Sequence, residues 1–219
     1  YMLTLEHVIE SKLFINCYKE VLQKYMQYGA RSSKKVDYFH EFIKSQIENV
    51  LCDKQLYQVK LEQNVVSMNA KQRKKCDIVA YKNDKPYIVF PVKLTMTNYK
   101  QNKNNAWENL TGEIMHLKWA NSDDFHIVPI NIYMNQVPYL DKNKTIKKFE
   151  KISYNDIKPY EILKEKQLTY DMINYIIDVD YNGVENCKIG DVYCKPPSIL
   201  SFNAHTPYRS FHDILKKLM

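Results

Sequence analysis

Two short stretches decide the fold of this chain: Cys76-Asp77-Ile78-Val79-Ala80-Tyr81 and Pro86-Tyr87-Ile88-Val89-Phe90-Pro91-Val92-Lys93. Both are rich in Ile, Val, Tyr and Phe, which favour strands, and residues 82–86 between them are polar without helical periodicity. This pattern predicts a β-hairpin. Because Asp77 opens the first strand and Lys93 closes its antiparallel neighbour, we expect a carboxylate and an ammonium group at the same end of the hairpin.

The aspartate, the hairpin and the lysine resemble the signature of the PD-(D/E)XK nuclease superfamily, in which an acidic residue also stands two positions before the lysine. Here Pro91 occupies that position, and Cys76 stands where a proline usually precedes the aspartate. Asp77, Val92 and Lys93 are the residues that match. The resemblance covers about half of the chain and implies an α/β fold with a restriction-endonuclease-like core, a central mixed β-sheet flanked by helices.

In several restriction endonucleases of this superfamily, the missing acid comes from the helix after the lysine strand. An apolar stripe at i, i+3, i+7 and i+10 predicts such a helix over residues 105–119; its members are Trp107, Leu110, Ile114 and Leu117. Glu108 follows Lys93 by 108 − 93 = 15 positions and is preferred because it lies near the helix start. Glu113, on the opposite flank of the stripe, is the reserve candidate.

Many members of the superfamily also carry a glutamate on a helix before the hairpin. Apolar spacing predicts a helix over residues 35–51, with one face formed by positions 36, 39, 40, 43, 47, 50 and 51. Glu41 and Glu48 flank this face on the same side, and Glu41 fits the family pattern better. A solvated position on a helix flank is the alternative for Glu41, Glu48 and Glu113.

The sequence is basic around the predicted site. The chain carries a formal net charge of +7, and residues 71–103 alone hold nine Lys and Arg against two Asp, a local charge of +7. Clustered cations bind the phosphodiester backbone by counterion release, and amide side chains in a loop expected at 95–105 can contact phosphates or base edges. A solvated loop and a composition rich in Asn and Lys are the alternatives. The expected DNA-binding residues are Lys71, Arg73, Lys74, Lys75, Asn98, Lys100, Gln101 and Lys103.

Length and composition predict one domain over residues 1–219, because 45% of the residues are hydrophobic and no Pro/Gly/Ser-rich linker divides the chain. The catalytic core is expected at about 35–135, and about 140–219 is assigned to specificity or dimerisation elements. Without a run of about 18 apolar residues we expect no membrane span, and without a signal peptide a soluble, cytoplasmic protein. Five cysteines in no regular framework are expected as reduced thiols.

The remaining pattern predicts further elements on both sides of the hairpin. Before and after it we expect a helix at 5–28 and strands at 57–66 and 126–134. Beyond residue 140 we expect partial helix at 145–166, a strand at 174–181 and a terminal helix at 211–219.

The resemblance implies a Mg²⁺-dependent endonuclease acting on double-stranded DNA, most like a type II restriction enzyme and dimeric because its sites are palindromic. Asp77, the backbone carbonyl of Val92 and Glu108 would bind Mg²⁺, and Lys93 would orient the attacking water or stabilise charge on the phosphate. Two alternatives stay open. One is a DNA-binding protein that kept the fold and lost the chemistry, with Pro91 recording the loss, and the other is a structure-specific repair or junction nuclease.

Overall fold

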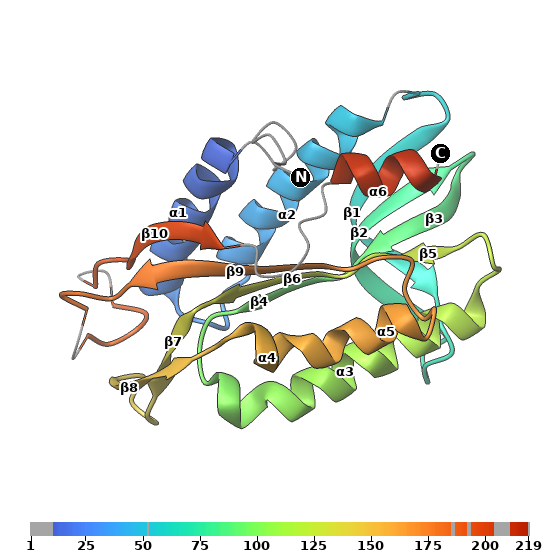
Figure 1. Ribbon diagram of the computed structural model, residues 1–219. Coiled ribbons are helices and arrows are strands. Elements are labelled where there is room, and N and C mark those ends of the chain that lie inside the picture. Colours follow the sequence, from blue (N-terminus) through green and yellow to red (C-terminus); the bar gives the residue numbers. More distant parts are fainter. Residues whose placement is uncertain (1–10, 52, 185–186, 192–193, 204–210, 219) are drawn as a thin grey trace.

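The fold is built on the predicted hairpin. The computed structural model describes residues 11–51, 53–184, 187–191, 194–203 and 211–218 of the chain (Figure 1). Strand β2 (Arg73–Lys82) pairs antiparallel with β3 (Lys85–Phe90), and β1 (Tyr57–Val66) pairs antiparallel with β2 on the other side. Together with the strands described next, these form a mixed sheet flanked by helices, as expected from the sequence.

Two prolines interrupt the central strands of this sheet without ending them. Strand β3 continues after Pro91 as β4 (Val92–Thr95), and β5 (His126–Ile127) continues after Pro129 as β6 (Ile130–Met134). The parallel register is the same on both sides of the prolines, since 126 − 88 = 38 and 130 − 92 = 38. The Pro91 carbonyl still accepts a hydrogen bond from the Ile130 amide at 2.8 Å. The two prolines therefore interrupt neighbouring strands at the same level of the sheet and bend it there, while the register between the strands is unchanged.

Beyond β6 the sheet is extended by β9 (Ile173–Asp180), which runs parallel to β6, and by β10 (Ser198–Asn203), which runs antiparallel to β9. The strand order is β1-β2-β3-β5 before the prolines and β4-β6-β9-β10 after them. A separate hairpin is formed by β7 (Gln136–Leu140) and β8 (Ile146–Lys151). Before Pro91, β3 pairs with β2; after Pro91, β4 pairs with β6 and not with β2. The strands β2 and β4 therefore separate at this point, and a site can form between them.

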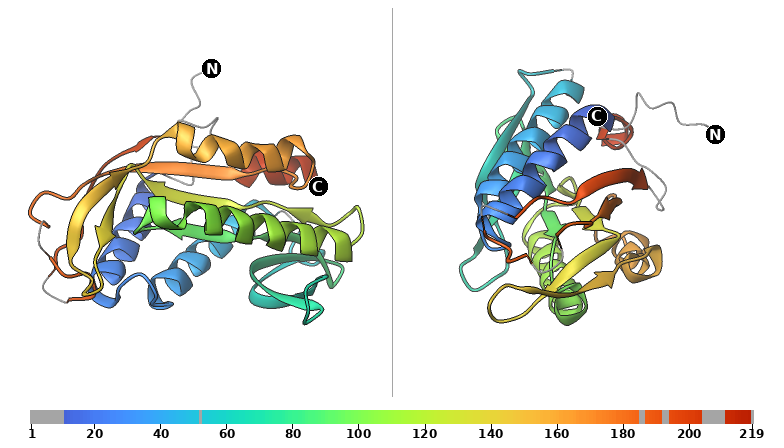
Figure 2. Two further views of the ribbon diagram at one scale, coloured as in Figure 1. Left: turned by 90° about the horizontal axis from the view of Figure 1, so that it is seen from below. Right: turned by 90° about the vertical axis from the view of Figure 1, so that its left-hand side faces the viewer.

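Helices cover both faces of the sheet (Figures 1 and 2). One face carries α1 (Ser11–Tyr28), α2 (Lys34–Val50) and α6 (Phe211–Leu218), and the other carries α3 (Tyr99–Ala120) with the short segments α4 (Tyr154–Ile157), η2 (Lys158–Glu161) and α5 (Ile162–Glu165). The buried apolar residues form two clusters, the first of which also includes Tyr99 of α3 and Ile157 of α4. Phe14, Tyr18 and Phe39 belong to the first, and Leu110 and Ile114 to the second. Within the described residues no helix combines the length and the apolar character needed to cross a membrane.

The structure confirms most of the predicted elements. The strand expected at 57–66 has those bounds, and α2, β9 and α6 lie within a residue or so of the helix at 35–51, the strand at 174–181 and the helix at 211–219. Residues 5–10 of the first predicted helix, and residue 219, lie outside the described residues. The strand expected at 126–134 is split at Pro129. Residues 146–151, where partial helix was expected, form strand β8 instead.

Two boundaries were predicted wrongly at the site itself. Strand β2 begins at Arg73, so Asp77 lies within the strand and not at its start. Helix α3 begins at Tyr99, so most of the loop expected at 95–105 is helical. Tyr99 is 3% exposed and packs against Tyr133, while residues 100–106 are solvated and show no apolar repeat. The helix start is therefore supported by tertiary contacts, such as that of Tyr99 with Tyr133, which periodicity does not reveal.

A buried polar pair links the two parallel strands at the centre of the sheet. Asn131 on β6 donates its amide to Asn174 on β9 at 2.8 Å, and both residues are buried. Replacing Asn131 with alanine removes that donor from a buried carbonyl oxygen. We expect a loss of about 1–3 kcal/mol in the free energy of unfolding, measured by urea denaturation. The exposed Asn143 is the control, and its alanine variant should stay within about 0.5 kcal/mol of the wild type; equal losses in both variants would contradict this account.

Candidate functional site

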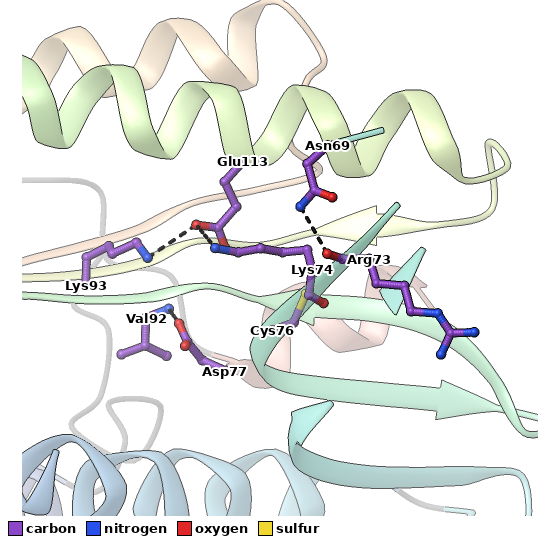
Figure 3. A network of polar contacts seen from close by, with 8 residues as sticks. All are labelled: Asn69, Arg73, Lys74, Cys76, Asp77, Val92, Lys93 and Glu113. Atoms are coloured by element: carbon purple, nitrogen blue, oxygen red, sulfur yellow. Dashed lines mark hydrogen bonds and ion pairs between the residues drawn. The ribbon is translucent and has the colours of Figure 1, made fainter. Parts of the chain in front are cut away.

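Asp77 lies where β2 and β4 separate. The β2–β3 pairing ends at Ile78 with Phe90, and continuing it would pair Cys76 with Val92. Instead, the Val92 amide donates a hydrogen bond to Asp77 Oδ2 at 2.8 Å (Figure 3). Where the β2–β3 pairing ends, the Asp77 carboxylate thus accepts the hydrogen bond that a backbone carbonyl of β2 would otherwise accept. This bond fixes the carboxylate beside β4 and leaves its other oxygen for a further partner.

The alternation of side chains between the two faces of the sheet is interrupted in β2 at Asp77. Cys76 and Val79 both pack in the core under α3, whereas Ile78 belongs to the core under α1 and α2. Strict alternation would place residues 76 and 78 on one face. Opposite this point, Glu62 on β1 has φ 56, although the pairs on either side of it are regular. A non-glycine residue in that region costs of order 1–3 kcal/mol, and such strain tends to gather at functional sites.

A third side chain reaches the same point from α2. His40 is 2% exposed, and its Nδ1 lies 3.5 Å from Glu62 Oε1. Neither ring nitrogen makes a hydrogen bond among the described residues, although both are buried. His40, Glu62 and Asp77 each offer one ligand atom, and these atoms lie within 4.8 Å of one another. The three residues form a group that could hold a metal ion.

The separations suit a metal ion. Ligand atoms about 2.1 Å from a shared ion lie at most about 4.2 Å apart, and the His40–Glu62 separation of 3.5 Å is already within that limit. His40 is buried, Asp77 is half-buried and Glu62 is exposed. A metal at this point would therefore have protein on one side and access from solvent on the other. These residues fit a divalent cation in their chemistry and in their exposure.

A second polar cluster lies on the α3 side of the same strands. Glu113 on α3 places Oε2 3.4 Å from Lys93 Nζ on β4 and 3.4 Å from Lys74 Nζ on β2 (Figure 3). The Glu113 side chain is only 8% exposed, while those of Lys93 and Lys74 are 43% and 36% exposed. Two ammonium groups against one carboxylate leave a net positive charge that remains open to solvent. This arrangement favours an anionic ligand such as a phosphate.

Val92 and Lys93 connect the two clusters, because they are consecutive residues of β4. The first holds Asp77 through its amide, and the second contacts Glu113 through its side chain (Figure 3). The observed bond of Val92 uses its N–H group; metal binding by its carbonyl remains a prediction. Of the residues proposed from the sequence, the structure therefore brings together Asp77, Val92, Lys93 and Glu113.

The structure separates the other two candidate glutamates from this point. Glu108 is exposed on α3, five residues before Glu113, which corresponds to roughly 140° around the helix. The carboxylate that contacts Lys93 thus belongs to the reserve candidate and not to the preferred one. Glu41 is exposed on α2, and it is its neighbour His40 that faces Asp77.

Sequence reasoning missed two members of the site. His40 was counted as part of the apolar face of its helix, and Glu62 was one polar residue in an alternating strand. The available signal was a histidine on an otherwise apolar helical face just before the hairpin. Glu62 gave no signal, because its position depends on a backbone conformation that the residue type does not indicate.

The predicted DNA-binding residues fall into two groups. Lys71, Arg73 and Lys75 are exposed beside the site, although Lys75 also pairs with Glu62, and Lys74 pairs with Glu113. The second group, Asn98, Lys100, Gln101 and Lys103, lies at the start of α3. Thirteen residues of helix at 1.5 Å each place Lys100 roughly 20 Å from Glu113 along the axis.

Asn98 has a structural role in that second group. It adopts φ 49 before the first turn of α3, and its Oδ1 accepts a hydrogen bond from the Leu140 amide at 2.8 Å. This contact ties the helix start to β7. The side chain is therefore already engaged, whereas Lys100, Gln101 and Lys103 are exposed.

Cys76 lies next to Asp77 but is not a reactive group. Burial raises the pKa of its thiol to about 12, and the charges of Glu113 and Asp77 act in the same direction. The thiol is therefore protonated at neutral pH and is a poor nucleophile. The other described cysteines, Cys17, Cys187 and Cys194, are also free thiols.

Comparisons with protein-family models, with curated proteins and with solved structures find no match for this chain.

Proposed function

We propose that this chain is a metal-dependent endonuclease that hydrolyses phosphodiester bonds of double-stranded DNA, in the manner of type II restriction enzymes. The observation that carries the proposal is that consecutive residues of β4 contact the two acids: the Val92 amide binds Asp77, and the Lys93 ammonium binds Glu113. A carboxylate near a metal-binding group and a partly exposed ammonium on the adjoining strand are the components that phosphodiester hydrolysis requires. Pro91, at the position of the missing acid, leaves Glu113 to supply the carboxylate beside the lysine.

The roles of the residues follow from their positions. Asp77, with His40 and Glu62, would hold the divalent ion, for which the resemblance implies Mg²⁺. The bound ion would polarise the phosphate and lower the pKa of a water molecule. Lys93 would donate hydrogen bonds to a non-bridging phosphate oxygen and stabilise the charge that develops there. Glu113 would hold the Lys93 ammonium in place.

The basic segment before Asp77 would bind the DNA backbone. Lys71 and Arg73 are exposed; Arg73 is the first residue of β2, the strand that carries Asp77, and Lys71 lies in the turn before it. The double variant Lys71→Ala/Arg73→Ala should weaken binding to all DNA sequences alike. Loss of two phosphate contacts should lower the slope of log affinity against log salt by about 2, measured by fluorescence anisotropy over a salt series. Lys216→Ala/Lys217→Ala, which removes two exposed charges from α6, is the matched control, and an equal slope in the two double variants would contradict this assignment.

The direct test is incubation of the protein with a long DNA of known sequence, in Mg²⁺, in Mn²⁺ and in EDTA. Discrete fragments that appear only with a divalent ion are expected, and their ends would define the site. A palindromic site would support a homodimer with two active centres. A smear or nicking at branched structures would indicate a repair or junction nuclease instead, and intact DNA would contradict the proposal.

One observation favours a second candidate, a DNA-binding protein without catalysis. Glu113 lies between two ammonium groups, an arrangement that would equally serve to anchor α3 to the sheet. With Pro91 at the usual acid position, the lysine cluster would then only bind phosphate. This candidate predicts a gel shift that weakens steeply with salt and no cleavage with any divalent ion.

A further inference from the structure

The histidine in the metal-binding group bears on which divalent ion the site prefers. His40 is 2% exposed, and its two ring nitrogens are buried without a hydrogen-bond partner among the described residues. An unpaired polar group in the interior costs about 1–3 kcal/mol.

The groups that face His40 are those of a metal site. Its nearest ionic neighbour is Glu62 Oε1, at 3.5 Å from Nδ1, and the Asp77 carboxylate lies within the same 4.8 Å group. Glu62 is held at this point by a left-handed backbone and by an ion pair with Lys75. Asp77 is oriented by the Val92 amide. Two of the three side chains thus have second contacts that fix their orientation, as metal ligands commonly do.

The ligand set has consequences for the identity of the ion. Mg²⁺ takes oxygen ligands almost exclusively and keeps several of its waters. Imidazole nitrogen favours first-row transition ions, whose affinity for mixed nitrogen and oxygen sites rises from Mn²⁺ to Cu²⁺ and falls again at Zn²⁺. A site with one imidazole and two carboxylates therefore discriminates against Mg²⁺ in a way that carboxylates alone do not.

We propose that His40, Glu62 and Asp77 form a binding centre that prefers a first-row transition ion such as Mn²⁺ over Mg²⁺, with His40 as the ligand that sets this preference. The inference rests on the metal site of the proposed function, in which the same three residues hold the ion, and it specifies which ion they prefer. It explains why a histidine is buried beside Glu62 although neither of its ring nitrogens makes a hydrogen bond among the described residues. It also assigns a role to the strained backbone of Glu62.

Metal binding by the full chain, freed of metal with a chelator, tests the inference without reference to activity. Isothermal titration with Mn²⁺ alone and with Mg²⁺ alone gives the two affinities. Co²⁺ absorption in the visible region reports whether a nitrogen ligand is bound. We expect Mn²⁺ to bind at least about tenfold more tightly than Mg²⁺, because only the first can exploit the imidazole.

The decisive variant is His40→Asn, which presents an amide oxygen near the position of Nδ1. We expect it to weaken Mn²⁺ binding by at least about tenfold, to change Mg²⁺ binding by less than about threefold, and to alter the Co²⁺ spectrum. His116→Ala, which removes a partly exposed histidine from α3, should change neither affinity. Glu62→Gln is a second variant that should weaken both ions, and circular dichroism shows whether each variant is folded.

The outcomes separate this inference from the proposed function. Equal Mn²⁺ and Mg²⁺ affinities in the wild type, or unchanged Mn²⁺ binding in folded His40→Asn, would overturn the inference even if the protein cleaves DNA. Selective Mn²⁺ binding that depends on His40 would support it even if the protein cleaves no DNA. In that second case the nuclease proposal would fail while the metal centre would stand.

Discussion

Replacing Lys93 with alanine is expected to lower metal-dependent DNA cleavage by at least about 100-fold and to leave DNA binding nearly unchanged. Lys93 is one of several cations near the site, so its loss removes little of the charge that attracts the backbone. Lys93 is, however, the residue that follows Val92 on β4, and the Val92 amide binds Asp77. Removal of one preorganised donor from a developing oxyanion commonly costs 10²–10³ in rate. Single-turnover cleavage and anisotropy on the same duplex separate the two effects.

The matched control for Lys93 is Lys216→Ala, which removes an exposed lysine on α6. It lowers the net charge by the same amount but lies on the other face of the sheet from α3 (Figure 1). We expect a cleavage rate within about twofold of the wild type. If Lys93→Ala retains wild-type cleavage, or loses affinity and rate in equal proportion, Lys93 only binds the backbone and the catalytic role is refuted.

The second large effect is expected at Glu113. The substitution Glu113→Gln keeps the shape of the side chain and removes the charge that holds Lys93 and Lys74. We expect cleavage to fall by about 10²–10³-fold, as when a group that fixes a catalytic donor is lost. Because the carboxylate is 8% exposed, an unpaired amide between two lysines also disturbs the ion pairs that join α3 to the sheet. A lower thermal midpoint should accompany the loss of activity.

The same substitution at Glu108 distinguishes the two acids that the sequence offers. Glu108 is exposed on another side of α3, and Glu108→Gln should cleave DNA within about threefold of the wild type. The reverse result, with Glu108→Gln inactive and Glu113→Gln active, would show that α3 rotates on binding DNA. It would also support Glu108 as the active-site acid, the choice that its position near the helix start suggested.

Much of the sheet was predictable, because its strands carry their own signals. The hairpin around residues 82–85 and the strand at 57–66 depend on β-branched and aromatic runs bounded by polar turns. The start of α3 was not predictable, because residues 100–106 carry no apolar repeat and the helix start is supported by tertiary contacts such as that of Tyr99 with Tyr133. The alignment of Pro91 with Pro129 in neighbouring strands was not predictable either, because it depends on the register between strands that are distant in the sequence.

The candidate site was predictable in part for the same reason. Asp77 and Lys93 stand at recognisable places in a hairpin, whereas the choice between Glu108 and Glu113 depends on how far α3 is rotated against β4. Periodicity leaves that rotation open when both acids flank the same stripe. His40 and Glu62 were missed because their significance arises only when α2 and β1 pack against β2.

The measurement that tests the central claim most directly compares wild-type protein with Asp77→Asn on one long DNA substrate, after removal of bound metal. Asp77 is the residue shared by the metal-binding group and the β2–β4 junction. We predict that wild-type protein cleaves the DNA when Mg²⁺ or Mn²⁺ is restored, and that folded Asp77→Asn binds the DNA with similar affinity and leaves it intact. Equal cleavage by the two proteins, or no cleavage by the wild type with either ion, would contradict the account.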